Sequence, residues 1–153
     1  VLSGYGIASI FAMGDARSNT ANGGTGSVID WTYYSPEAFQ AELDAGRVVV
    51  MDFTADWCIN CKVLEKTVLE DQAVASLLDD PGVTPMKVDI TSSANEAGNA
   101  KLAEMGYSTI PLLVVFDPQG QAVFKNDFYR VQQVVDAITA ARGSHAPAEE
   151  PAG

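Results

Sequence analysis

The sequence predicts an α/β fold in which a central mixed β-sheet of four or five strands is flanked by helices on both faces. Three observations support this prediction. Apolar, β-branched runs alternate along the chain with segments that have helical spacing. The run Val48–Phe53 is almost continuously apolar, which is typical of a strand covered on both faces. Two further strand-like runs flank the turn Asp117–Gly120, which predicts an antiparallel hairpin and therefore a mixed sheet.

The 153 residues are enough for one domain with a hydrophobic core. We place this domain at residues 28–142, after an apolar stub and flexible linker at 1–27 and before a flexible tail at 143–153. The apolar stretch 1–14 is too short to span a bilayer and lacks the basic start of a signal peptide. We interpret it as the end of a longer upstream hydrophobic region. A processed leader remnant and a segment introduced by cloning are the alternatives.

The first half of the domain opens with a helix at 35–46, for which Ser35 is the N-cap, Pro36 the first helical residue and Gly46 the end. A β-branched strand follows at 47–55. Residues 58–71 have helical spacing, and the segment 71–80 either continues this helix or forms a second one. The residues of this region that are available for burial are Val63, Val68 and Leu69.

The second half of the domain begins with a strand at 83–91 and a helix at 93–106 that ends at Gly106. The hairpin pairs strands at 110–117 and 121–126. An amphipathic helix at 130–143 completes the fold. The order of elements therefore predicts a sheet between two layers of helices.

Charge and the count of metal-binding residues exclude several functions. With 9 basic and 20 acidic residues the net charge is −11, which argues against nucleic acid or an anionic membrane surface as a partner. The two cysteines and the single histidine, His145 in the tail, cannot readily form a closed zinc site. A cysteine hydrolase needs a histidine near its thiol, and His145 is poorly placed for that role.

Cys58 and Cys61 lie three residues apart at the predicted junction between a strand and a helix. The unpaired N–H groups and the macrodipole of a helix start favour an anion, so we expect Cys58 to be an exposed attacking thiolate with a lowered pKa. Cys61 lies nearly one turn further, close enough for a disulfide, and we expect it to be the sheltered resolving thiol. The alternatives are a structural disulfide, although so short a loop removes little entropy from the unfolded chain, and metal binding.

Two acidic residues near these thiols are candidates for proton transfer. Asp52 lies inside the apolar strand, and Glu65 follows Cys61 by four residues, on the same face of the helix. A buried carboxylate keeps a raised pKa and can take or return the Cys61 proton during disulfide exchange. The two acids and the thiols would then titrate together. The alternatives are a tolerated buried acid at Asp52 and a solvent-facing Glu65.

Trp57 and Ile110–Pro111 are two further candidate positions of the site. Trp57, next to Cys58, is either a core aromatic residue or, in our interpretation, a lid that shields the thiolate. Ile110–Pro111 opens a strand, a position where proline is normally confined to edges or special turns.

Together, the strand with Asp52, the motif "ADWCINCK" and the tripeptide Thr109–Pro111 resemble the thioredoxin superfamily over residues 31–142. The resemblance implies a thioredoxin-like fold and a cis-proline loop at Ile110–Pro111 that offers backbone to a substrate segment. It also implies that Trp57, Ile59 and Asn60 contact the substrate. Because Ile59-Asn60 replaces the Gly-Pro of ordinary thioredoxins, the reduction potential stays open.

Three segments, "FTADWCINCKVLEKTVLEDQAV", "KVDITSSANE" and "VFDPQGQ", resemble the C-terminal domain of the thiol:disulfide interchange protein DsbD family. The resemblance implies a protein-disulfide reductase that has no cofactor besides the redox-active disulfide Cys58–Cys61 and that includes Glu65 in its active site. It further implies a role in cytochrome c biogenesis and a periplasmic location, with tethering to the inner membrane through an upstream segment. The implied partners are a membrane electron donor domain and a periplasmic thioredoxin-like acceptor, and we expect the chain to be a monomer.

Two other functions remain open at this point. A free-standing thioredoxin-type general disulfide reductase would be cytoplasmic and would be served by a separate reductase. A copper(I)-binding module would use the two soft thiolates, preferably with a further Met ligand, but Met86 and Met105 have no fixed spacing to the motif.

Overall fold

The computed structural model describes residues 29–143. Within these residues, five strands form one sheet in the order β1-β3-β2-β4-β5. β1, β3 and β2 run parallel to one another, whereas β4 is antiparallel to β2 and β5 is antiparallel to β4. The strands are β1 (Thr32–Tyr33), β2 (Val48–Thr54), β3 (Val83–Asp89), β4 (Leu112–Phe116) and β5 (Ala122–Asn126). The expected mixed sheet is therefore confirmed, and it has five strands.

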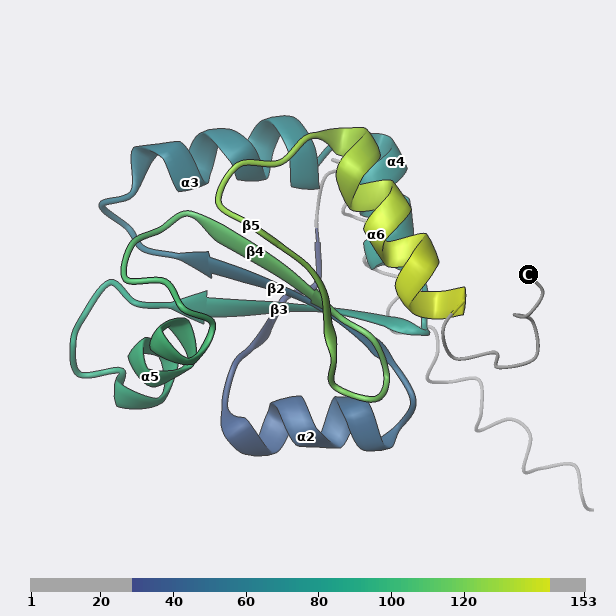
Figure 1. The fold of residues 1–153 in the computed structure, drawn as a ribbon. Helices are drawn as coiled ribbons and strands as arrows, with labels where there is room; N and C mark the ends of the chain where they lie inside the picture. The colour runs from purple at the N-terminus through teal and green to yellow at the C-terminus, as the bar shows by residue number, and fades with distance from the viewer. Residues whose placement is uncertain (1–28, 144–153) are drawn as a thin grey trace, which may run out of the picture.

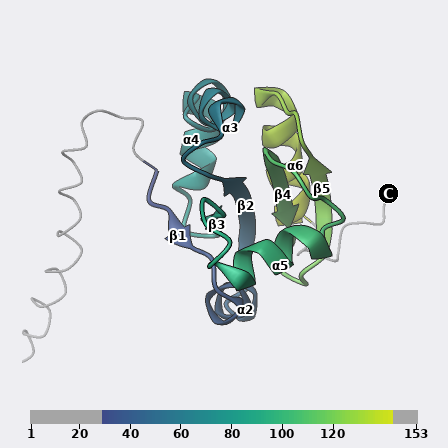
Figure 2. The same cartoon turned by 90° about the vertical axis from the view of Figure 1, so that its left-hand side faces the viewer.

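Helices cover both faces of this sheet (Figure 1, Figure 2). One layer contains α3 (Ile59–Leu64), the π-helix η1 (Glu65–Leu69), α4 (Gln72–Leu78) and α6 (Val131–Gly143). The other layer contains α2 (Pro36–Asp44) and α5 (Glu96–Glu104). In Figure 1, α3 lies above the side of the sheet toward which β2 points and where it ends.

The alternation of side chains along β2 creates two hydrophobic cores. The first core, on the side of α3, η1, α4 and α6, includes Val48, Val50, Leu64, Val68, Leu113, Tyr129 and Val134. The second core, on the side of α2 and α5, includes Val49, Met51, Phe53, Cys58, Cys61, Leu102 and Val114. Because β2 is central and covered on both faces, every one of its residues is buried.

Local signals read from the sequence act as expected at three element ends. The Ser35 hydroxyl accepts a hydrogen bond of 3.0 Å from the Ala38 N–H, which caps α2 ahead of Pro36. Gly106 follows α5 with a φ of 88°, a conformation that favours glycine. Gly120 has a φ of 86° in the turn between β4 and β5.

The structure differs from the sequence-based prediction at three points. The two-residue strand β1 was not expected, because so short a pairing leaves no periodic pattern. In the segment 58–80, the π-helix η1 after α3 was not expected, whereas the separate helix α4 is one of the two predicted alternatives, and Asp71 caps it through a 3.0 Å hydrogen bond from the Ala73 N–H. Val63 was expected to be buried, but 51% of its surface is exposed, because Leu64 and Val68 occupy the inward face instead.

Two predictions concern residues outside the described range. The apolar stub with its linker, residues 1–27, and nearly all of the tail at 143–153 lie there, as does His145. Within residues 29–143, no helix has both the length and the apolar character needed to cross a bilayer.

Candidate active site: a disulfide at the end of the central strand

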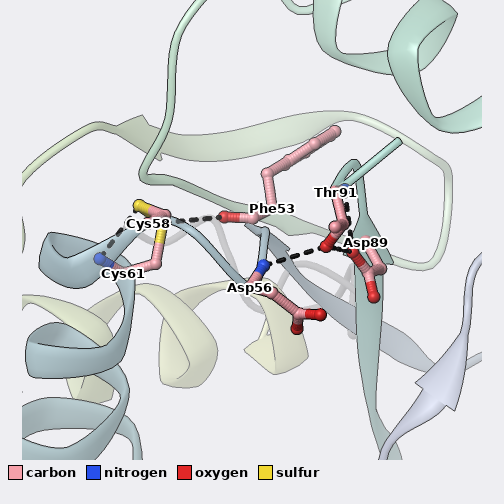
Figure 3. The surroundings of a disulfide bond; sticks show 6 residues. All are labelled: Phe53, Asp56, Cys58, Cys61, Asp89 and Thr91. Carbon is pink, nitrogen blue, oxygen red and sulfur yellow. Dashed lines mark hydrogen bonds between the residues drawn. A yellow bond between two sulfur atoms is a disulfide. The ribbon is translucent and has the colours of Figure 1, made fainter. Parts of the chain in front are cut away.

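Cys58 and Cys61 form a disulfide just beyond the end of β2, with their Cα atoms 5.3 Å apart (Figure 3). Cys58 is the N-cap of α3, and its sulfur accepts a 3.1 Å hydrogen bond from the Cys61 N–H. The helical segment continues without a break from α3 into η1. Cys58 therefore lies where the backbone N–H groups of the helix start point, which is the place expected for a thiolate once the disulfide is reduced.

The two sulfurs differ in access, although less than the sequence suggested. Cys58 was expected to be exposed, but in the disulfide form only 6% of its surface is accessible. Cys61 has no accessible surface, and its sulfur lies 3.8 Å from the carbonyl oxygen of Phe53. A reduced Cys61 thiol has a donor for this carbonyl, whereas Cys58 is the sulfur with an opening to a partner. Cys58 is therefore more accessible than Cys61, as predicted, but the difference in accessible surface is smaller than expected.

The loop before the cysteines is anchored to the end of β3 (Figure 3). The backbone N–H of Asp56 donates a 2.8 Å hydrogen bond to the Thr91 hydroxyl oxygen, and that hydroxyl donates in turn to the Asp89 carboxylate. The Thr91 N–H also donates to Asp89, at 2.9 Å. These bonds from Thr91 lower the pKa of Asp89, with a smaller contribution from Lys62 and against the effect of partial burial. Sequence reasoning missed this link, since nothing in the sequence "DIT" shows which loop it contacts.

Trp57 is not a core aromatic residue. Its side chain is 62% exposed, and the indole N–H donates a 3.2 Å hydrogen bond to the carbonyl oxygen of Thr91. The same Thr91 therefore fixes both the loop backbone and the indole beside Cys58. The predicted role of Trp57 as a lid over the thiolate stays a prediction.

Asp52 lies inside the sheet, between Lys87 of β3 and Leu113 of β4 in the strand register. Its carboxyl is completely buried, and neither of its oxygens has a hydrogen-bond partner among the described residues. Burial is the main cause that raises the pKa of Asp52 well above its usual value, and the neighbouring Glu65 carboxyl raises it further. Lys87 and Lys62 oppose this rise in part.

Glu65 is buried at the start of η1, so the alternative of a solvent-facing residue does not apply. Its Oε2 atom is buried without a hydrogen-bond partner among the described residues, and its carboxyl lies close enough to Asp52 to perturb it. The structure thus brings Asp52 and Glu65 together as a buried acid pair on the first-core side of β2. Their assigned part in the proton transfer to Cys61 stays a prediction.

Two further buried groups accompany the acid pair and were not singled out from the sequence. The hydroxyls of Thr54 and Tyr129 are both buried and, among residues 29–143, have no hydrogen-bond partner. Thr54 lies two residues after Asp52, on the same face of β2. Tyr129 lies between β5 and α6, and the pKa of its phenol is strongly raised by burial and then by the charges of Asp52 and Glu65. The alternation of β2 could have indicated Thr54, but no sequence signal indicates Tyr129.

The residues predicted to contact a substrate lie on several segments of the chain. Ile59 and Asn60 lie in the first turn of α3 and are exposed, Ile59 strongly so. The Ile110–Pro111 peptide bond is cis, the conformation implied by the resemblance. Ile110 is partly buried and packs against the second core, which contains both cysteines. Substrate contact at these positions stays a prediction.

In residues 29–143, no group of three or more His, Cys, Asp and Glu side chains is placed so that it could hold a metal ion. Met86 is fully buried and Met105 half-buried in or against the second core.

Comparison with known proteins gives two kinds of likeness. In sequence, the thiol:disulfide interchange protein DsbD of Pectobacterium atrosepticum is 33% identical over 95 residues, which are 59% of this chain and 16% of that protein. The thiol:disulfide interchange protein DsbD 1 of Pseudomonas aeruginosa is 40% identical over 76 residues, 50% of this chain and 12% of that protein. The chain therefore spans only a small part of the length of these relatives.

In structure, the C-terminal domain of Neisseria meningitidis DsbD in the oxidised form aligns with a TM-score of 0.55 at 24% identity, over 72% of this chain and 98% of that domain. A thioredoxin from Thermus thermophilus aligns with a TM-score of 0.62 at 19% identity, over 80% and 93% of the two chains. These likenesses show a shared fold. A family model described as thioredoxin-like matches residues 30–118, which is more than half of the chain, and the chain therefore belongs to the thioredoxin-like family.

Proposed function

We propose that this domain is a thiol–disulfide oxidoreductase that passes electrons between proteins through Cys58 and Cys61, in the manner of the C-terminal domain of DsbD. The observation that carries the proposal is the disulfide at the end of β2, in which Cys58 caps a helix and keeps some access while Cys61 is fully buried. The sequence likeness to DsbD proteins supports the same chemistry.

The reaction with an oxidised partner has two steps. The Cys58 thiolate attacks one sulfur of the partner's disulfide, so that a mixed disulfide forms and one partner thiolate leaves and is protonated. The Cys61 thiol then gives its proton to the Asp52–Glu65 acid pair and attacks the Cys58 sulfur, which releases the second partner thiolate. This thiolate takes up a proton as the acid pair gives up its own. The partner gains two electrons and two protons, and this domain ends with the Cys58–Cys61 disulfide. The reverse sequence loads the domain with electrons from a donor.

The cellular context is a finer part of the proposal. By analogy with DsbD, the donor is an adjoining membrane domain, the acceptor is a thioredoxin-like protein of the periplasm, and the electrons serve cytochrome c biogenesis. The anionic surface implied by the net charge of −11 leaves protein partners as the reasonable class. The domain works without a cofactor, because the disulfide itself carries the electrons.

Trapping of the mixed disulfide tests the proposal. The Cys61→Ala variant cannot complete the second step, so it should accumulate disulfide-linked adducts through Cys58 when its source cells are lysed under acid quench. The matched control is Cys58→Ala, which retains a buried thiol and should trap far less. Mass spectrometry of the adducts names the partners, and equal trapping by the two variants, or none by either, refutes the proposed roles.

A copper(I) titration of the reduced protein separates the proposal from the copper-binding alternative. Under the proposal, the wild type reduces a protein disulfide such as that of insulin with turnover in the presence of a dithiol donor. Tight stoichiometric copper binding without any disulfide turnover would favour the copper-binding module instead.

A further inference from the structure

Buried oxygens without hydrogen-bond partners are concentrated at one place in this molecule. They are both carboxylate oxygens of Asp52, the Thr54 hydroxyl, Glu65 Oε2 and the Tyr129 hydroxyl. Folded proteins leave few buried polar groups unpaired, since each one loses its hydration without gaining a partner. Within the described residues, every buried side-chain oxygen or nitrogen that lacks a partner belongs to these four residues. Such a concentration calls for a functional explanation rather than a packing explanation.

Tyr129 is, with Thr54, one of the two members of this group that have no part in the proposed exchange reaction. It is among the largest fully buried side chains of the domain. It packs in the first core together with Leu64, which directly precedes Glu65, and Leu113, which lies opposite Asp52 in the β2–β4 register. Its phenol therefore lies on the side of β2 to which the acid pair points, and it senses the charges of both acids.

The chemistry of the phenol fits a donor for these acids. Burial, and then the charges of the two acids, raise its pKa, so the phenol keeps its proton during disulfide exchange. In this oxidised structure the hydroxyl has no acceptor at hydrogen-bond distance among the described residues, so its bond to a carboxylate forms only when these side chains move closer as a carboxylate becomes charged. An apolar residue of similar size would fill the same space without an unpaired oxygen.

We propose that Tyr129 is a positioning residue whose hydroxyl acts as the hydrogen-bond donor for the negatively charged Asp52–Glu65 pair during disulfide exchange. This inference rests on the proposed function, because it concerns how the acid pair takes the proton of Cys61. The donor stabilises the charged form of the pair, which is the form that accepts this proton.

Several charged groups face Asp52, and Tyr129 acts together with them. Glu65 from η1 raises its pKa, while Lys87 from β3 and Lys62 from α3 lower it. The two lysines act through their charge, with no hydrogen bond to either Asp52 oxygen. Besides Thr54, Tyr129 is thus the neutral group that can supply a donor within the buried region itself. Its removal should raise the pKa of Asp52 further and delay the loss of the Cys61 proton.

The test follows both steps of exchange in reduced protein with 5,5′-dithiobis(2-nitrobenzoic acid), an aromatic disulfide that releases one coloured thiolate per step. In stopped-flow experiments from pH 4 to 9, the second release reports the attack of Cys61 on the Cys58 mixed disulfide. For Tyr129→Phe, we expect the acid limb of this second step to move up by about one pH unit, which is roughly a tenfold slower release below the limb. The first step, which depends on Cys58, should change much less.

Matched variants separate the proposed role from a structural one. Tyr33→Phe removes a phenol hydroxyl from an exposed tyrosine in β1 and should leave the pH profile unchanged. Tyr129→Leu provides a second variant without the hydroxyl and should show the same shift as Tyr129→Phe. Adding Tyr129→Phe to the Asp52→Asn, Glu65→Gln double variant should cause no further shift, since both acids that Tyr129 acts on are then absent.

The outcomes are distinguishable. If the wild type releases both thiolates but Tyr129→Phe follows the wild-type profile, the role of Tyr129 is refuted while the proposed function stands. A variant that is less stable in urea yet keeps the wild-type profile refutes it equally, because it shows only a structural role. If the wild type releases no second thiolate, the proposed function itself fails.

Discussion

The buried carboxyl of Asp52 should make the stability of the oxidised domain depend on pH in a way that one substitution removes. Asp52 is completely buried, lacks a hydrogen-bond partner among the described residues and lies beside a second acid. The folded state therefore binds the Asp52 proton more tightly than the unfolded chain does. It follows that the stabilising effect of this proton is fully present below the ordinary aspartate pKa and is lost as the pH rises through the raised folded-state pKa.

Residue 52 cannot ionise in the Asp52→Asn variant, so the variant should become more stable than the wild type as the pH rises. Near pH 4 and below, both side chains are neutral, and the two proteins should have similar free energies of unfolding. At higher pH, the folded wild type either keeps Asp52 protonated, although the solution favours its ionisation, or buries an unpaired negative charge. We expect the variant to be more stable by about 1–3 kcal/mol there, with the attraction of Lys87 and Lys62 limiting the gain.

Urea unfolding of the oxidised proteins from pH 4 to 9, at constant salt, measures this difference as a change of the midpoint at constant m-value. Asp56→Asn is the matched control, because it removes an exposed carboxylate four residues away and leaves the buried Asp52 in place, so the pH dependence caused by Asp52 should persist in it. The reasoning would be refuted if the stability difference between Asp52→Asn and the wild type stayed constant with pH. It would also be refuted if the wild type became more stable than the variant at high pH. In reduced protein, the same variant should slow the attack of Cys61 while the fold is kept.

Three further predictions follow from packing and hydrogen bonds. Thr91→Val removes the hydroxyl between Asp89 and the loop before the cysteines. Urea unfolding should show a loss of about 1–2 kcal/mol that is fully present above the ordinary aspartate pKa and disappears as the pH falls through the lowered Asp89 pKa. Gly98 lies in α5, and Gly98→Ala would place a Cβ 2.9 Å from Cγ1 of Val88. Thermal unfolding should therefore show a destabilisation of about 1–3 kcal/mol despite the better helix propensity of alanine. Leu64→Ala should cost about 2–4 kcal/mol in urea unfolding and Val63→Ala less than about 1 kcal/mol, and equal losses would contradict the assigned faces of α3.

Much of the fold follows from local patterns that act over a few residues. The Ser35–Pro36 start of α2, the apolar run of β2 and the turn that ends at Gly120 each specify one element through steric or hydrogen-bonding rules. The order of these elements then leaves few ways to cover the sheet on both faces. The faces of the helical segment after Cys58 were less predictable, because Val63 and Leu64 are adjacent and similar in polarity, and only the direction of packing on the sheet chooses between them.

The sequence by itself determined the chemistry of the site: two cysteines three residues apart at a strand-to-helix junction, with an acid in the strand and another one turn into the helix. These relations follow from chain geometry, so they could be read without coordinates. Only the tertiary structure decided how far Cys58 is covered, that Thr91 anchors the loop at Asp56, and that Tyr129 shares the buried region of the acid pair. The physical reason is distance along the chain. Contacts between segments that are dozens of residues apart depend on how the whole sheet closes around them, and no local pattern contains that information.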